Sequence, residues 1–193
     1  MAIDPTPSQE IIDQFVGNAH GDLAAVKHLL EKYPSIINSN ASWTETAVQA
    51  AAQTGQVDIV NYLIERGAEY DICSAAMLGN LDCIEEFLKE DTSLVNARGA
   101  HGIPLMYFPI IHARIKVAEY LLQRGADLNA TSPDGITPLH AAVMFNQPEM
   151  AGWLLEHGAD PNPKYANQTP LTMARDKKQE QLQQILSTHG GIE

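Results

Sequence analysis

The chain has 193 residues, a length that corresponds to one domain or to two small ones. It carries 12 lysine and arginine residues against 24 aspartate and glutamate residues, for a formal net charge of −12. Nucleic acid is therefore excluded as an expected partner, because phosphate binding requires a basic stripe and the sequence shows none. The acidic composition favours solubility and also suits a protein partner with a basic surface.

The sequence shows no signal for a membrane or for secretion. Residues 1–10 combine acidic residues with two prolines and lack the apolar core of a signal peptide. No apolar run approaches the roughly 20 residues of a membrane span. Two cysteines, Cys73 and Cys83, do not make a disulfide framework, and this fits a reducing compartment. We expect a cytoplasmic protein that binds no membrane.

Six apolar residue pairs recur along the chain, and each marks the second helix of a helix pair. Successive pairs lie 34, 24, 34, 33 and 31 positions apart. A nearly constant spacing in this range predicts a solenoid of stacked units. The six apolar pairs are Leu29-Leu30, Leu63-Ile64, Phe87-Leu88, Leu121-Leu122, Leu154-Leu155 and Ile185-Leu186.

The first three helix pairs include the one step that is too short. The first pair ends at Pro34 and, as a terminal unit, should present one polar face. The second pair begins with Thr46-Ala47-Val48 and ends on Gly67-Ala68. Only a few residues then separate Gly67 from the next helical pattern, which starts near Ile72. Because the 24-residue step leaves no room for a hairpin between units, we predict a gap in the row of hairpins near residues 68–73.

The fourth pair has bulky residues where other units have alanines in the first helix. These residues run from Met106 to Ile111 and include Tyr107 and Phe108. Pro109 lies inside the predicted helix and should shorten or kink it, because proline lacks the backbone N–H. We expect Tyr107 and Phe108 to pack inward and to fill the space left by the missing hairpin; the alternative is that they are exposed on the binding surface.

The fifth unit carries the local signals in full. Asp134-Gly135 is a turn signal for the tip of a hairpin. Thr137 reads as an N-cap, and Pro138 follows at the first helical position. Trp153 falls on the apolar face of the second helix, and Gly158 stands where a left-handed C-cap is expected. The tripeptide Gly-Ala-Asp at 158–160 repeats the one at 125–127, which lies 33 positions earlier.

The segment Thr137-Pro138-Leu139-His140-Ala141-Ala142 resembles the Thr-Pro-Leu-His-x-Ala motif of ankyrin repeats, and it lies within one period of the repeated Gly-Ala-Asp. The resemblance implies an all-α ankyrin-repeat solenoid of six helix pairs joined by irregular β-hairpin fingers, with one finger missing near residues 68–73. The sixth pair begins at Thr169-Pro170-Leu171, and its polar second helix indicates a C-terminal cap. We expect a single ankyrin-repeat domain over residues 1–193. Its approximate units are 8–37, 38–67, 68–97, 98–128, 129–161 and 162–193.

Catalysis has no signature in the sequence, and we expect neither enzyme activity nor a cofactor. The chain lacks Gly-x-Ser-x-Gly, a glycine-rich phosphate loop and Gly-Lys-Ser. The six helix pairs also leave no residues for a catalytic domain. His140 belongs to the ankyrin motif, where the resemblance implies a structural role.

Metal binding is an alternative with little support. No Cys-x-x-Cys or His-x-x-x-His spacing is present, so we expect Cys73 and Cys83 to be thiols of the core. The alternative that stays open is a small-ligand or metal site at the junction of the third and fourth units. Its lining would be Cys73, His101, Tyr107 and His112.

The resemblance also implies a binding groove, because partners of ankyrin repeats usually dock on finger tips and on exposed positions of first helices. Aromatic and methionine anchors in such a groove are typical of binding hot spots, each costing about 2 kcal/mol or more on truncation. The implied function is non-catalytic binding of another protein by a monomer; the alternative is a regulatory subunit or inhibitor of an enzyme. Alignment of the units on Gly135 and Thr137 gives ten candidate partner-binding residues: Trp43, Glu45, Gln53, Met77, Ile110, Asp134, Ile136, Met144, Phe145 and Tyr165.

Overall fold

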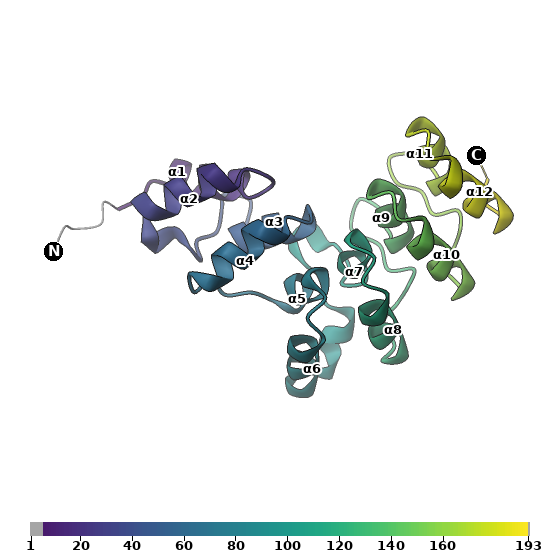
Figure 1. The fold of residues 1–193 in the computed structure, drawn as a ribbon, viewed down its shortest axis with the longest axis horizontal. Coiled ribbons are helices and arrows are strands. Elements are labelled where there is room, and N and C mark those ends of the chain that lie inside the picture. The colour runs from purple at the N-terminus through teal and green to yellow at the C-terminus, as the bar shows by residue number, and fades with distance from the viewer. Residues whose placement is uncertain (1–5, 193) are drawn as a thin grey trace.

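A computed structural model describes residues 6–192, so residues 1–5 and 193 of the predicted domain lie outside the described part. Within this range twelve α-helices follow one another as six pairs, and the first and last pairs lie at the two ends of the elongated stack (Figure 1). The predicted all-α solenoid of six helix pairs is confirmed. The first helices are α1 (Gln9–Asn18), α3 (Ala47–Gln53), α5 (Ile72–Leu78), α7 (Tyr107–Ile111), α9 (Pro138–Met144) and α11 (Pro170–Asp176). The second helices are α2 (Leu23–Lys32), α4 (Val57–Glu65), α6 (Leu81–Glu90), α8 (Ile115–Gln123), α10 (Pro148–Glu156) and α12 (Glu180–Thr188).

The first helices form a continuous layer in which each packs against the next, from α1 to α11. Small residues make this close approach possible: Ala51, Ala75 and Ala141 are fully buried between neighbouring helices. Each unit thus buries its apolar face against its neighbours, as expected for a solenoid. The longest helices, α1, α2 and α6, have 10 residues each. Accordingly, none of the helices within residues 6–192 is both long enough and apolar enough to cross a membrane.

The helix ends follow the predicted signals. The Thr137 side chain accepts a hydrogen bond from the backbone N–H of His140, and the His140 ring accepts one from the backbone N–H of Thr137. The two bonds together form a capping box. Thr46 and Gln49 form the same arrangement at the start of α3. Gly158 follows α10 with a φ of 96°, the left-handed conformation that was predicted for it.

The fingers differ from the predicted β-hairpins. Among residues 6–192 the only strand-like features are two isolated bridges, Arg98 with Pro104 and Tyr165 with Gln168. The finger before α9 is closed by a tight turn, in which the backbone N–H of Ser132 donates to the carbonyl of Ile136 at 2.9 Å. A single turn closes each finger before a strand ladder can start.

The connection between α4 and α5 is the shortest link between units. It consists of residues 66–71, and Asp71 at its end caps α5 by accepting a hydrogen bond of 2.9 Å from the Ser74 backbone. At the corresponding point after α8 stands Asn129, whose side chain accepts a bond of 2.7 Å from the backbone N–H of Asp160 in the next unit. At equivalent positions after the second helix, Asp71 is therefore the N-cap of the next helix, whereas Asn129 is followed by a finger.

The fourth unit has a shortened first helix and buried aromatic side chains, and both features follow from its sequence. Helix α7 has five residues, whereas α3, α5, α9 and α11 have seven, so the predicted short helix around Pro109 is confirmed. Tyr107 and Phe108 are 6% and 2% exposed, so the prediction that they pack inward is confirmed. Phe108 packs directly against Gly99 of the preceding finger: a Cβ on Gly99 would lie 2.6 Å from the Phe108 ring.

The fourth unit also reaches past the third to contact the second. A ring nitrogen of His112, which follows α7, lies 2.9 Å from the backbone carbonyl of Gly55, which follows α3. The short 3-10 helix η3 (Ala100–Gly102) in the fourth unit's finger packs against α3. Because the third unit has no finger between them, the second and fourth units come into direct contact.

Candidate protein-binding surface

A buried carboxylate organises the N-terminal part of the surface. Glu45 is 1% exposed, and both of its oxygens accept hydrogen bonds. The indole Nε1 of Trp43 donates to Oε2 at 2.7 Å, and the amide of Gln53 donates to Oε1 at 2.6 Å. Burial of a carboxylate is costly unless it is hydrogen-bonded in this way. The bond from Gln53 ties the finger that carries Trp43 and Glu45 to the end of α3.

Two histidines from other units complete this arrangement, which we call the Glu45 cluster (His20, Trp43, Glu45, Gln53 and His101). The Nε2 atoms of His20 and His101 lie 3.8 and 3.6 Å from Oε2 of Glu45. His20 also lies 3.1 Å from the Gln53 amide. The cluster therefore joins residues of the first, second and fourth units.

The finger of Trp43 is also tied to the first unit. The Asp13 carboxylate in α1 accepts bonds from the backbone N–H and the hydroxyl of Ser42 at 2.7 and 2.8 Å, and another from the Gln9 side chain. Hydrogen bonds from Gln9 and from the Ser42 backbone lower the pKa of Asp13. Trp43 next to this anchor is 41% exposed, so its ring reaches solvent, as a partner-binding residue requires.

For three of the ten candidate residues, the prediction that they line an open groove is wrong. Met77 and Ile110 are 0% exposed, because the fourth unit closes onto the second and covers the first helix of the third. Neither residue lines an open groove. Glu45 is buried beneath Trp43 and supports that ring from below. The predicted continuous groove is therefore interrupted at its centre.

The C-terminal candidates are accessible to different degrees. Asp134 is exposed, and four apolar side chains remain partly exposed around it and along α9. We call these five residues the C-terminal patch: Asp134, Ile136, Met144, Phe145 and Tyr165. The Phe145 and Tyr165 rings rest edge-on against Tyr107 and His140, with centroids 6.0 and 5.8 Å apart. Burial, with a smaller effect of Tyr165, raises the pKa of Tyr107 to about 12.

The fingers of the fifth and sixth units pack closely in this patch. Gly135 has a φ of 92°, and a Cβ at this position would lie 2.6 Å from the carbonyl oxygen of Lys164. Only glycine fits both the backbone conformation and this approach. The close contact fixes Asp134 relative to the finger that carries Tyr165.

His140 has a structural position, as the family resemblance implied. It is fully buried, and its Nδ1 accepts a hydrogen bond of 3.2 Å from the backbone N–H of Thr137. Burial lowers the pKa of His140 to about 4, and the nearby backbone of Gln168 opposes the shift only in part. A neutral imidazole is what the capping box requires, since Nδ1 must act as an acceptor.

The alternative site at the junction of the third and fourth units finds no support in the geometry. His101 faces Glu45 and His112 faces the Gly55 carbonyl, whereas Tyr107 packs against Phe145. Cys73 is buried beside Phe108 and leaves no water-sized space, and burial raises the pKa of its thiol. Cys83 instead lies 2.8 Å from the Tyr70 hydroxyl. Within residues 6–192 no group of three or more His, Cys, Asp or Glu side chains is arranged to hold a metal ion.

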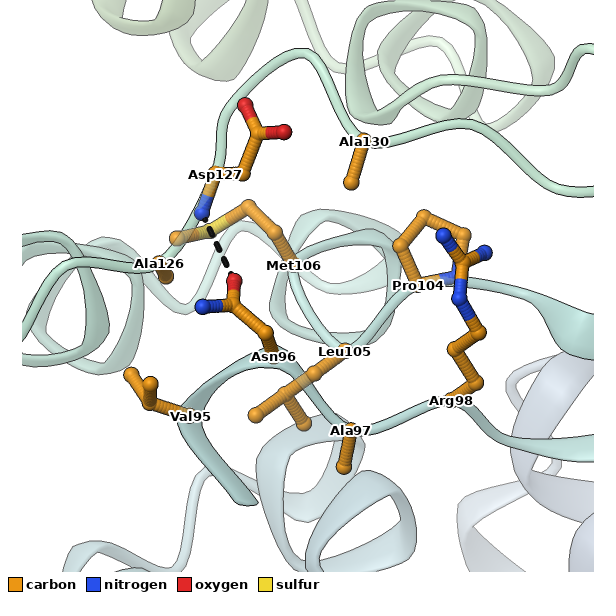
Figure 2. Close-up of a pocket in the computed structure, with 10 residues that line it drawn as sticks. All are labelled: Val95, Asn96, Ala97, Arg98, Pro104, Leu105, Met106, Ala126, Asp127 and Ala130. Atoms are coloured by element: carbon orange, nitrogen blue, oxygen red, sulfur yellow. Dashed lines mark hydrogen bonds between the residues drawn. The ribbon is translucent and has the colours of Figure 1, made fainter. Parts of the chain in front are cut away.

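A pocket of about 200 Å³ lies beside the fourth unit's finger, and its polar side chains are already engaged (Figure 2). The Asn96 amide oxygen accepts a bond of 3.0 Å from the Asp127 backbone, which Figure 2 shows as a dashed line. Arg98 donates to the carbonyls of Gly102 and Thr131 at 2.8 and 2.6 Å. We regard this pocket as a consequence of the packing between units.

The ten candidate residues include neither His20 nor His101, although alignment of the units places His101 at the finger tip of the fourth unit. His101 is 56 positions from Glu45, so no local pattern links them. The available signal was the 24-residue step, because a missing finger brings the next finger toward the previous one. That step predicted the gap but not which residues would meet across it.

Comparison with known proteins agrees with the repeat architecture. A family model described as ankyrin repeats (3 copies) matches residues 113–193, and an ankyrin repeat model matches residues 45–75. The two matches together include more than half of the chain. Neither includes residues 76–112, the stretch that contains the short α7 and the finger packed against α3.

Three curated relatives align with part of the chain. Alpha-latrocrustotoxin-Lt1a of Latrodectus tredecimguttatus is 29% identical over 54% of this chain and 8% of its own length. The NAD-capped RNA hydrolase NUDT12 of Pongo abelii is 34% identical over 42% of this chain and 18% of its own length. The human protein of the same name is 35% identical over 38% of this chain and 16% of its own length. The chain thus spans less than a fifth of each of these relatives.

The geometry and the family models agree. Helix pairs that recur at a nearly constant spacing, the Thr137-to-Ala142 motif with its capping box, and a continuous layer of first helices all fit the matched models. Ankyrin repeats generally mediate protein–protein interaction, and proteins built from them are typically non-catalytic. The chain belongs to the ankyrin repeat family.

Proposed function

We propose that this chain is a non-catalytic module that binds another protein through its fingers and first helices. The observation that carries the proposal is the Trp43 side chain, which is 41% exposed while its indole nitrogen is held by the buried Glu45 carboxylate. A ring fixed in this way loses little conformational freedom on binding. Exposed aromatic rings are the side chains that most often dominate binding energy.

The C-terminal patch supplies a second contact surface in this proposal. Met144, Phe145 and Tyr165 are partly exposed, and ring contacts with Tyr107 and His140 fix the positions of Phe145 and Tyr165. The closed centre over Met77 and Ile110 separates this patch from Trp43. The partner would therefore contact two separate patches, with Gln53 beside Trp43 at one and Asp134 beside Phe145 at the other.

The charge of the chain indicates what kind of partner fits. A net charge of −12 favours a protein with a basic surface, because complementary charge accelerates association and disfavours acidic competitors. The continuous first-helix layer supports the treatment of residues 1–193 as one domain with the six units predicted from the sequence. We place this monomeric module in the cytoplasm, an assignment supported by two free cysteines, Cys73 and Cys83.

The test is a pull-down from a lysate of the source organism with the wild type and a Trp43→Ala, Phe145→Ala double variant. Ile192→Ala is the matched control, because Ile192 is the other large apolar side chain that is well exposed within residues 6–192. Circular dichroism establishes that all three proteins are folded. A protein that is retained by the wild type and the control but lost by the double variant supports the proposal. Equal retention by all three contradicts it.

A further inference from the structure

A cavity of about 300 Å³ lies where the turn between α5 and α6 meets the start of α8. Its walls combine apolar side chains with two cationic residues and no acidic one. The lining residues are Gly79, Leu81, Ala113, Arg114, Ile115, Lys116 and Val117. In a chain with 24 acidic and 12 basic residues, a cavity whose only charged lining residues are cations calls for an explanation.

Arg114 lines this cavity, and its side chain has no partner among residues 6–192. Its Nε is buried without an acceptor, and its side chain makes no hydrogen bond or ion pair with any part of the chain from residue 6 to residue 192. Burial of an arginine nitrogen without an acceptor is costly, and native proteins rarely leave such groups unsatisfied. An anion from outside the chain would give the Nη groups of the guanidinium the acceptor that the chain itself does not supply.

Other units show what the side chain at this position normally does. Arg114 is the N-cap residue of α8, as Gln147 is for α10 and Gln179 is for α12. Both glutamines donate to a backbone carbonyl of the preceding unit, Gln147 to Ile111 at 2.8 Å and Gln179 to Val143 at 2.9 Å. Arg114 makes no such bond, so bridging two units does not explain its presence.

The position of Arg114 is nevertheless fixed. Its side chain lies across Gly79, where a Cβ would be only 3.0 Å from Cδ and 3.1 Å from Nε of the arginine. The left-handed turn at Gly79, with a φ of 84°, thus provides the surface on which the arginine rests. An arginine held at one edge of a cavity is a preorganised donor.

The first turn of α8 adds to the positive character of the cavity. Helices α4, α6, α10 and α12 each carry an acidic residue in the first turn, namely Asp58, Asp82, Glu149 and Glu180. Helix α8 carries none there, and Lys116 occupies its first turn instead. The positive end of the helix dipole therefore keeps its full effect at this cavity.

We propose that this cavity binds an oxyanion, presented as a phosphoryl group or as a carboxylate. The Arg114 guanidinium would donate charge-assisted hydrogen bonds to it, and the Lys116 ammonium and the N-terminus of α8 would add attraction. Leu81 and Val117 would shield these interactions from water, which strengthens them. The site is distinct from the Trp43 surface, so the proposal stands independently of the protein-binding function.

The test is an NMR titration that follows the backbone amides of Gly79 and of residues 114–117. The probes are inorganic phosphate and acetate, each compared with chloride at equal ionic strength. We expect saturable shifts at these amides with at least one of the two oxyanions and none with chloride. Tighter binding of phosphate identifies the phosphoryl group as the natural ligand chemistry, and tighter binding of acetate identifies the carboxylate.

Arg114→Gln is the decisive variant, because glutamine is the residue that α10 and α12 use at the same position and the fold should tolerate it. We expect its affinity for the oxyanion to fall at least about tenfold, the effect of losing one strong charge-assisted hydrogen bond. Lys89→Gln removes the same charge in the last turn of α6 and should leave the affinity unchanged. Lys116→Gln gives a second variant should Arg114→Gln prove unfolded, and we expect it to weaken binding as well.

Three results would overturn the proposal. They are the absence of saturable shifts with both oxyanions, an unchanged affinity in a folded Arg114→Gln or Lys116→Gln variant, and an equal loss in Lys89→Gln, which would indicate a general charge effect.

Discussion

The indole nitrogen of Trp43 donates a 2.7 Å hydrogen bond to the Glu45 carboxylate, although the tryptophan is 41% exposed and the glutamate only 1%. This pair couples the interior of the stack to its surface. The same carboxylate receives the Gln53 amide and lies near His20 and His101, so three units meet at one buried charge. The orientation of the most exposed aromatic ring thus depends on the junction created by the missing finger.

Replacement of Glu45 by Gln tests this dependence. Trp43 and Gln53 both donate to Glu45, and a glutamine side chain offers a single carbonyl oxygen, so one donor would lose its acceptor. We expect the free energy of unfolding to fall by about 1–3 kcal/mol. Urea denaturation measures the change, and Glu65→Gln on the exposed surface of α4 serves as the control. An unchanged midpoint for Glu45→Gln would show that the buried carboxylate has no structural role.

Replacement of Gly158 by Val tests the left-handed end of α10. A Cβ at Gly158 would meet nothing within 4 Å, so any destabilisation must come from the φ of 96° and not from a clash. We expect a loss of more than about 1 kcal/mol in the free energy of unfolding. The control is Gly152→Ala inside α10, where space is also open and alanine should stabilise the helix by about 0.5–1 kcal/mol. Thermal melting of both variants should give shifts of opposite sign.

Replacement of Gly135 by Ala adds a steric conflict to the same backbone strain. Its φ of 92° resembles that of Gly158, but a Cβ would lie 2.6 Å from the Lys164 carbonyl oxygen. We therefore expect Gly135→Ala to lower the melting midpoint clearly more than Gly158→Ala, for which backbone strain alone costs about 1–2 kcal/mol. Equal midpoints for the two alanine variants would show that the fifth and sixth fingers are free to separate.

The sequence was sufficient to predict the features that depend on local signals. The helix pairs, the Thr137 cap, the left-handed Gly158 and the shortened helix at Pro109 each follow from a few neighbouring residues, and each is present. The positions of Tyr107 and Phe108 also followed, because bulky residues stood in place of inward alanines.

An alignment of single units could not predict the features that depend on contact between units. Such an alignment assigned Met77 and Ile110 to an open groove because their equivalents are open in a regular stack. The fourth unit instead closes onto the second, as the contact of His112 with Gly55 shows, and buries both residues. The same closure brings His101 to Glu45. Sequence spacing indicated that a finger was missing, but the resulting rearrangement depends on packing between units that are not neighbours in the sequence.

The last prediction concerns His140, whose pKa is lowered to about 4 by burial. In the unfolded chain its pKa is near 6.5, so the unfolded state binds more protons between these two values. The stability that depends on a neutral His140 is therefore complete above about pH 6.5 and is lost as the pH falls toward 4. Each pH unit in this window costs at most about 1.4 kcal/mol.

His140→Gln separates this titration from the structural role of the residue. Gln49 at the equivalent place in α3 accepts a bond of 3.1 Å from the Thr46 backbone and completes a capping box without a titrating group. We expect His140→Gln to fold and to lose less stability between pH 7 and pH 5 than the wild type, as measured by urea denaturation at both values. Because both proteins keep every other ionisable group, the difference between their pH dependences isolates the imidazole. Parallel pH dependences would mean that folding does not lower the pKa of His140, and they would contradict the prediction.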